Sequence, residues 1–321
     1  MTELLSIDNL HVSFPTEDGI VKAVDGVSLT VNSGETVAIV GESGSGKTVT
    51  SLSVMGLHKK GSVNIEGSIK INDGGVIKDV VNLSPNEVRD IRGRAVAMIF
   101  QDPMSSLHPY YKIGNQLAEA FEVHNPGNKK AAKARAIEML DLVGISEPDQ
   151  RAEEFPHQFS GGMRQRAMIA MALSCNPELL IADEPTTALD VTIQAQILEI
   201  LEKSARELNV AVLLITHDLG VVAGICDRVA VMYGGRIVEE APVDDLFERP
   251  LMPYTWGLMK SIPQMDEVQG GRLYTIPGSP PVMSRPPKGC AFAARCEFVV
   301  DKCQTSVPEL TEYAPNSMVR C

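Results

Sequence analysis

The chain has 321 residues, of which 44% are hydrophobic and 22% charged, and its formal net charge is -12. These values fit a globular protein of one large domain or two ordinary ones, and they argue against nucleic acid as the main partner, because an acidic surface repels phosphate backbones. We expect no signal peptide, because the N-terminal residues show no basic region followed by an apolar run, and no apolar stretch approaches the roughly 18 residues that cross a bilayer. We therefore expect a protein kept inside the cell, which works at a membrane only if other chains hold it there.

The first part of the chain predicts an α/β fold. Residues 1–35 alternate apolar and polar residues as strands do, and "TVAIV" at 36–40 is typical of a buried strand. Helix formers dominate from Pro109 to about Cys175. Strand-like runs return at "LLIAD" and "AVLLITHD", with a helical stretch between them. This order predicts a largely parallel sheet that a helical insertion splits in sequence.

The composition changes after about residue 240. Residues 241–321 hold many prolines and four of the six cysteines. We interpret residues 1–240 as the main domain, with a helical subdomain at about 109–175, and residues 241–321 as a C-terminal extension.

A phosphate-binding loop is predicted at "GESGSGKT", residues 41–48, which fits G-x-x-x-x-G-K-[ST] between a strand and a helix. Glycines at three positions let the backbone turn so that its N–H groups point at the phosphates. Lys47 would reach the β- and γ-phosphates, and Thr48 would bind Mg²⁺. A plain glycine-rich turn is the alternative. The residues expected to surround the phosphates are Gly41, Ser43, Gly44, Ser45, Gly46, Lys47 and Thr48.

A second feature is "LLIADE" at 179–184, an apolar strand that ends in two carboxylates. At such a strand end Asp183 can hold the water shell of the metal ion, while Glu184 faces the attacking water. A capped strand end before Pro185 is the alternative, which the neighbouring phosphate loop makes weaker.

The discriminating motif is "FSGGMRQR" at 159–166, which resembles the signature of ABC-type ATPases. Phe159 and Met163 stand where the commonest form has Leu and Gln, and the diagnostic core is Ser160, Gly161 and Gly162. Other sequence motifs of that family occur in this chain in the usual order. The resemblance implies Gln101 as the Q-loop glutamine near Mg²⁺, Asp190 in the D-loop, His217 as the switch histidine, and Phe14 as the aromatic residue that stacks on adenine. For Phe14, a core-facing strand residue is the alternative.

A closer resemblance covers residues 5–321. "AVDGVSL", "AMIFQDPMSSLHP", "IADEPTTALDVTIQAQI" and "VMYGGRIVEE" look like the ATP-binding subunits of bacterial dipeptide and oligopeptide importers, with His108 and Met252 in place of the usual Asn and His. The resemblance implies a P-loop ATPase fold with a mixed sheet core, an antiparallel β subdomain, a helical insertion and a small cysteine-rich appendix.

The same resemblance implies the mechanism and the partners. The chain would hydrolyse ATP with Mg²⁺ as a dimer with a second, related ATPase subunit, whose ATP the signature motif would contact. Glu184, His217 and Gln101 would be catalytic. The pair would lie peripherally on the cytoplasmic face of the inner membrane and drive two membrane-spanning permease subunits, with an extracytoplasmic solute-binding protein as an indirect partner. Nucleic acid is not expected.

Three other functions stay open at this point. The first is an importer ATPase for nickel or another small solute. The second is a soluble ABC ATPase of DNA repair or translation, although such chains usually have two cassettes, coiled coils or basic surfaces. The third is an iron–sulfur redox sensor with a vestigial ATPase, which the presence of Lys47, Asp183, Glu184 and His217 disfavours.

The cysteines follow a spacing of C-x5-C-x6-C-x17-C over Cys290, Cys296, Cys303 and Cys321. This spacing matches neither common zinc sites nor bacterial ferredoxins, so zinc, an iron–sulfur cluster and free thiols stay open. The resemblance implies a [4Fe–4S] cluster on these four residues, first of all in a structural role. We interpret Cys175 and Cys226 as small buried residues.

Overall fold

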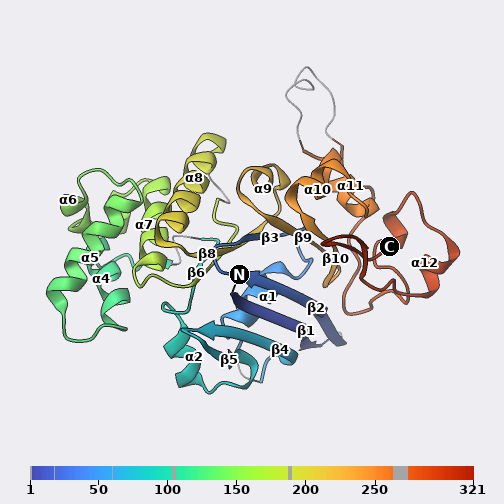
Figure 1. The fold of residues 1–321 in the computed structure, drawn as a ribbon, viewed down its shortest axis with the longest axis horizontal. Coiled ribbons are helices and arrows are strands. Elements are labelled where there is room, and N and C mark those ends of the chain that lie inside the picture. Colours follow the sequence, from blue (N-terminus) through green and yellow to red (C-terminus); the bar gives the residue numbers. More distant parts are fainter. Residues whose placement is uncertain (1, 18, 60, 103–105, 187–189, 263–273) are drawn as a thin grey trace. The chain divides into compact units, whose positions relative to one another are not determined.

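A computed structural model describes residues 2–17, 19–59, 61–102, 106–186, 190–262 and 274–321. Figure 1 follows the elements along the chain. The strands are β1 (Glu3–Thr16), β2 (Gly19–Asn32), β3 (Thr36–Val40), β4 (Asn64–Asp73), β5 (Val76–Asp79), β6 (Val96–Ile99), β7 (Leu179–Asp183), β8 (Ala211–Thr216), β9 (Arg228–Tyr233), β10 (Arg236–Pro242), β11 (Thr311–Ala314) and β12 (Ser317–Val319).

The α-helices are α1 (Lys47–Val54), α2 (Pro85–Ile91), α4 (Ile113–Glu122), α5 (Lys129–Leu142), α6 (Pro148–Ala152), α7 (Gly161–Leu173), α8 (Val191–Leu208), α9 (Leu219–Ile225), α10 (Val243–Glu248), α11 (Pro253–Lys260) and α12 (Asp301–Thr305). Short 3-10 turns lie at η1 (Val80–Asn82), η2 (Pro156–Gln158) and η4 (Ala293–Arg295).

The chain forms two compact units. The first comprises Met1–Leu5, Val31–Glu35 and Lys70–Leu214, and the second comprises Ser6–Thr30, Thr36–Ile69 and Ile215–Cys321. Each unit therefore combines segments that lie far apart in the sequence.

A mixed sheet runs through the second unit, with strand order β11-β12-β10-β9-β3. β3 pairs with β9 in parallel, whereas β9, β10, β12 and β11 pair antiparallel in turn. All the residues of β3 but the first are buried, as its apolar run predicts for a central strand. The domain boundary near residue 240 stays a prediction; because β12 pairs with β10, the last part of the extension joins the same sheet as the strands before it.

The first unit contains the helical insertion and the parallel pair of β6 and β7. Helices α4, α5, α6 and α7 pack on one another there, and Figure 1 shows them as one green cluster. Leu117 of α4, Leu140 of α5 and Ile169 of α7 are fully buried, as expected for helices that share an apolar core. Four packed α-helices thus lie between Ile113 and Leu173, while the bounds of the helical subdomain stay a prediction.

The antiparallel β subdomain is visible at the hairpin of β4 and β5, where Lys70 pairs with Asp79 and Asp73 with Val76. Gly74 and Gly75 form its turn, both with positive φ, as a tight hairpin requires. After it, Ser84 and Glu87 form a capping box at the start of α2, with Pro85 at the first helical position. Local sequence therefore fixes both the hairpin and the helix that follows.

The cysteines outside the C-terminal group differ from each other. Cys226 is buried at 7% exposure, as predicted. Cys175 is only half-buried, because it follows the C-cap of α7, where the chain leaves the helix. Burial raises the pKa of its thiol.

Candidate functional site

The predicted phosphate loop connects β3 to α1. Gly46 precedes α1 with a φ of 105°, a left-handed conformation that favours glycine. A Cβ atom at Gly46 would overlap the carbonyl oxygen of Ala23, and one at Gly41 would overlap that of Met232. Glycine is therefore required at both positions by close backbone contact, as well as by the turn.

Lys47 and Ser45 place polar groups inside this loop. Lys47 is 4% exposed, and its Nζ donates to the carbonyl oxygens of Gly41 at 2.7 Å and Glu42 at 3.1 Å. Among the described residues, the buried hydroxyl of Ser45 has no hydrogen-bond partner. A buried polar group without a partner is costly, and a phosphate oxygen would satisfy it. The loop therefore offers an ammonium, a hydroxyl and a helix N-terminus to an anion.

Neighbouring strands and helices hold the loop in place. The N–H of Gly235, in the turn between β9 and β10, donates to the Ser45 carbonyl at 3.0 Å. The N–H of Glu42 donates to the hydroxyl oxygen of Tyr254 on α11 at 2.8 Å. Burial raises the pKa of Tyr254, so this hydroxyl stays neutral at physiological pH. The turn after β9 and helix α11 thus hold the backbone of the loop.

The side chain of Glu42 makes an ion pair that the sequence motifs do not indicate. Nη1 and Nη2 of Arg295 donate to its two carboxylate oxygens at 2.6 and 2.9 Å. Arg295 lies in η4, between Cys290 and Cys296. The only signal in the sequence is the carboxylate itself, which needs a counter-charge in a loop that binds phosphates.

The carboxylates predicted for catalysis lie at the end of β7 in the first unit. Asp183, the last residue of the strand, is 3% exposed. Glu184 follows with a φ of 47°, which is uncommon for a residue other than glycine. The side-chain amide of Gln101 donates to the carboxylate of Glu184 at 2.8 Å. The structure thus brings Gln101 to Glu184, 83 positions away in the sequence and directly after Asp183.

The signature motif forms the start of α7, also in the first unit. Ser160 is the N-cap, and its hydroxyl accepts a hydrogen bond from the N–H of Met163 at 3.3 Å. Ser160 and Gly161 are exposed, whereas Phe159 is buried at 2% exposure. A Cβ atom at Gly162 would lie 3.2 Å from Ile193, which is a tight contact. The motif therefore presents a helix N-terminus to solvent. Asp190, the predicted D-loop residue, is the exposed N-cap of α8.

Two further predicted residues lie in the second unit with the phosphate loop. His217 is exposed and comes directly after β8, before the short helix α9. Phe14 in β1 is half-buried, and its ring meets that of His58 edge-on at 5.8 Å between centroids. Burial lowers the pKa of His58, although its hydrogen bond to the Val49 carbonyl acts in the opposite direction. The side chain of Phe14 is therefore partly packed against its neighbours and partly exposed to solvent.

The four C-terminal cysteines gather in one region. The N–H of Cys290 donates to the carbonyl of Cys303 at 2.7 Å, and Gly289 permits this approach because a Cβ there would overlap the same carbonyl. Burial raises the pKa of Cys321, and the thiols of the other three cysteines raise it further. Within the described ranges, no group of three or more His, Cys, Asp or Glu side chains could hold a metal ion as it stands. The backbones at Cys290 and Cys303 are therefore in direct contact, and the described cysteines form no metal site as they stand.

Comparison with known proteins decides the family. The ABC transporter family matches residues 24–187, and the C-terminal region of oligopeptide/dipeptide transporters matches residues 238–303. The chain is 52% identical over 323 residues to the oligopeptide transport ATP-binding protein AppD of Bacillus subtilis, covering 100% of this chain and 97% of that protein. This chain belongs to the ATP-binding subunits of oligopeptide and dipeptide ABC transporters.

Other relatives of this family agree. The dipeptide transport ATP-binding protein DppD of Bacillus subtilis is 52% identical, with 100% of this chain and 95% of that protein covered. The oligopeptide transport ATP-binding protein OppD of Salmonella typhimurium is 47% identical, with 99% and 93% covered. As a member of this family, the chain is an ABC-type ATPase that couples ATP hydrolysis to peptide import.

Solved structures confirm the predicted ABC ATPase fold. The dimeric post-hydrolysis state of the ATP-binding cassette MJ0796, bound to ADP and Pi, matches with a TM-score of 0.65 and 28% identity. The match covers 74% of this chain and 98% of that one. Among the described helices, none is long and apolar enough to span a membrane.

Proposed function

We propose that Glu184 is the general base of ATP hydrolysis, or polarises the attacking water. As the resemblance to ABC-type ATPases implies, we assign the binding of Mg²⁺ to Thr48, Gln101 and Asp183. The observation that carries this proposal is the 2.8 Å hydrogen bond from Gln101 to Glu184, directly after the buried Asp183. A carboxylate that accepts this hydrogen bond is held in one direction, as a general base needs. We also assign His217 the role of the switch histidine at the γ-phosphate.

Binding of ATP would rest on the phosphate loop. Lys47 and the helix N-terminus supply positive charge, and the free hydroxyl of Ser45 supplies a donor without prior loss of another bond. The backbone of Gly41, Ser43, Gly44, Ser45 and Gly46 would surround the phosphates, and Phe14 would stack on adenine. Because phosphoryl transfer needs mostly positioning and charge stabilisation, a loop held by these contacts suits the reaction.

A second ATPase subunit would complete each catalytic site. Ser160, Gly161 and Gly162 form the N-terminus of α7, where Ser160 and Gly161 are exposed, and a helix N-terminus is suited to an anion. We therefore assign it to the γ-phosphate of ATP bound by the partner subunit, with Asp190 at the same interface. The dimeric state of the MJ0796 cassette bound to ADP and Pi supports this assignment.

We assign the ATPase pair to the cytoplasmic face of the inner membrane, where it drives two permease subunits that receive di- or oligopeptides from an extracytoplasmic binding protein. The match of residues 238–303 to the C-terminal region of peptide transporters supports this, together with the full-length relatives. The chain has no membrane-spanning candidate among its described helices, so the proposal places membrane passage in the permease subunits.

We also assign a [4Fe–4S] cluster to Cys290, Cys296, Cys303 and Cys321. The mutual influence of their thiols supports it, and thiolates are the ligands of such clusters. Zinc is the alternative occupant, since thiolates bind it as well. Bound there, the cluster would connect the segments of the extension.

Reconstitution tests the function. The chain is assembled in vesicles with its partner ATPase and both permease subunits, and uptake of labelled di- and oligopeptides is measured with ATP on the chain's side. ATP-dependent peptide uptake that Glu184→Gln abolishes is the expected result. Uptake of nickel but not of peptides would overturn the peptide assignment and leave the ATPase standing. Full uptake with Glu184→Gln would overturn the assignment of the base.

A further inference from the structure

The second residue of the phosphate loop is tied to the cysteine-rich extension. Nη1 and Nη2 of Arg295 donate hydrogen bonds to the two carboxylate oxygens of Glu42, at 2.6 and 2.9 Å. The two residues lie 253 positions apart in the sequence. The Arg295 side chain is 4% exposed and that of Glu42 is 28% exposed. Two parallel, charge-assisted hydrogen bonds in a mostly buried setting are among the stronger polar contacts in proteins. Both residues lie in the second unit.

The ion pair places charge where ATP binds. Nζ of Lys47, the expected phosphate ligand, lies 3.1 Å from the carbonyl oxygen of Glu42, so the Glu42 residue borders the phosphate site itself. A carboxylate in that position repels the negative phosphates of ATP. Arg295 neutralises it, and its hydrogen bonds direct the carboxylate toward the guanidinium.

Arg295 is itself held rigidly. Its Nε donates to the Pro277 carbonyl at 2.9 Å, and Nη2 donates to the Ile276 carbonyl at 3.2 Å. Nη1 also donates to the Tyr233 hydroxyl at 3.2 Å, and the guanidinium lies over the rings of Tyr233 and Phe292 at 5.8 and 5.9 Å. A guanidinium with this many fixed partners loses little further freedom when it binds a carboxylate.

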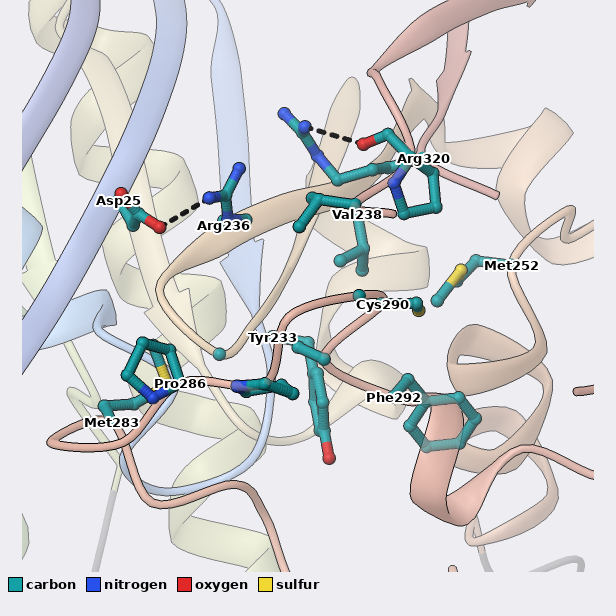
Figure 2. A pocket seen from close by; sticks show the side chains of 16 residues that line it. Asp25, Tyr233, Arg236, Val238, Met252, Met283, Pro286, Cys290, Phe292 and Arg320 are labelled. Carbon is teal, nitrogen blue, oxygen red and sulfur yellow. Dashed lines mark hydrogen bonds and ion pairs between the residues drawn. The ribbon is translucent and has the colours of Figure 1, made fainter. Parts of the chain in front are cut away.

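Aromatic packing connects this arrangement to the sheet and to α11. Tyr233 ends β9, and its ring lies 4.5 Å from that of Tyr254, which accepts the N–H of Glu42. Phe292 packs against both rings, at 5.3 and 5.4 Å. Figure 2 shows Tyr233 and Phe292 with Cys290 around a small cavity of about 40 Å³. Glu42 is therefore held through its backbone by Tyr254 and through its side chain by Arg295.

We propose that Arg295 is a positioning residue for ATP binding: it neutralises Glu42 and fixes the phosphate loop, which makes residues 276–295 of the extension a working part of the nucleotide site. The proposal does not depend on what the cysteines bind. It predicts an electrostatic signature that a purely structural role of Arg295 in the extension would lack.

The test measures equilibrium binding of a non-hydrolysable ATP analogue with Mg²⁺ to the purified full chain, in a set of single and double variants. Arg295→Gln should raise the Kd about tenfold, which corresponds to about 1.4 kcal/mol. Glu42→Gln alone should leave the Kd within about threefold of the unsubstituted chain. In the double variant, Glu42→Gln should restore most of the affinity, because no uncompensated carboxylate remains beside the phosphates.

The control is Arg249→Gln, which removes the same charge from an exposed pair with Asp245, at 75% and 40% side-chain exposure. Its Kd should not change. An unchanged Kd for folded Arg295→Gln, or a loss of affinity that Glu42→Gln fails to restore, would overturn the proposal.

If Arg295→Gln does not fold, Arg295→Lys takes its place, since it keeps the charge but not the paired hydrogen bonds. It should weaken binding about threefold, and Glu42→Gln should reverse that; equal Kd values across these variants would overturn the proposal.

Discussion

Gln101 donates its side-chain amide to the carboxylate of Glu184 at 2.8 Å, although 83 positions separate the two residues in the chain. Glu184 has a positive φ of 47°, and this hydrogen bond fixes the direction of its side chain as the backbone leaves β7. The pair links the loop after β6 to the residue proposed as the base. Gln101 is also proposed to bind Mg²⁺. Binding of ATP with Mg²⁺ would therefore compete with the hydrogen bond between Gln101 and Glu184.

Loss of the Gln101 amide should slow hydrolysis more than it weakens binding. Gln101→Ala removes a hydrogen bond to a charged group, a contact of about 1.5–3 kcal/mol, so kcat should fall at least about tenfold. Steady-state ATPase assays and analogue binding would check this, with Gln150→Ala on the exposed face of α6 as the control. A kcat that stays unchanged would show that the contact has no part in catalysis.

Glu184→Gln should bind ATP with nearly the same Kd and hydrolyse it at least about 10²-fold more slowly, by the usual contribution of a general base. The amide is nearly isosteric but cannot accept a proton from water. Single-turnover hydrolysis measured alongside nucleotide binding separates the two effects. Glu199→Gln makes the same change on the exposed side of α8 and should keep full activity. Normal turnover in the Glu184 variant would refute the assignment.

Phe14 can be tested against its alternative role in the core. Stacking of an aromatic ring is worth about 0.5–1.5 kcal/mol, so Phe14→Leu should raise the Kd for ATP by about two- to tenfold while it keeps most of the apolar volume. His58→Leu, which removes the ring that Phe14 meets at 5.8 Å, should have a smaller effect. Thermal unfolding measured beside binding decides between the roles. Reduced stability with an unchanged Kd would make Phe14 a packing residue.

Asp73 should make stability depend on pH. Burial alone would raise the pKa of this carboxyl, but hydrogen bonds from Lys78 at 2.7 Å and Arg94 at 2.6 Å outweigh it and lower the pKa. A lowered pKa in the folded state contributes stability above the ordinary carboxyl pKa, and this is lost as pH falls through the folded value. Both cations are partly exposed, so Asp73→Asn should cost only about 1 kcal/mol at pH 7.

Urea unfolding at two pH values checks that sign. The stability difference between the unsubstituted chain and Asp73→Asn should be present at pH 7 and should shrink below about pH 4, where the carboxyl protonates. Asp141→Asn, at an exposed position of α5, serves as the matched control. A difference that grows toward low pH would contradict the assigned direction of the pKa.

Protein purified without oxygen should contain about four iron and four acid-labile sulfide per chain, as a [4Fe–4S] cluster requires. Cys303→Ser should lower both, whereas Cys175→Ser, outside the group, should leave them unchanged. Elemental analysis and the visible absorption of the cluster provide the readouts. One zinc per chain would show that the four cysteines form a structural zinc site and would contradict the cluster. The absence of any metal would show that the four thiols bind none.

Sequence motifs predict those parts of the site whose chemistry is local. The residues of the phosphate loop are consecutive in the sequence. The strand pattern before them and the helix pattern after them are therefore enough to predict the conformation of the loop. The end of β7 follows from "LLIADE" for the same reason. The ion pair of Arg295 with Glu42 was not predicted, because its partners lie 253 positions apart and Arg295 belongs to none of the quoted motifs. Cys175 was expected to be buried, since its apolar neighbours do not reveal that α7 ends just before it.

The turn between β9 and β10 constrains how this chain can vary in length. Gly234 and Gly235 both have positive φ, the N–H of Gly235 holds the phosphate loop at Ser45, and its carbonyl accepts the N–H of Asp25 at 2.8 Å. One inserted residue would shift both contacts and the register of the hairpin behind them. Homologous sequences should therefore keep this turn at constant length, while the exposed turn at Gly74 and Gly75, which has open space around both glycines, should tolerate insertions and offers a site for a reporter tag.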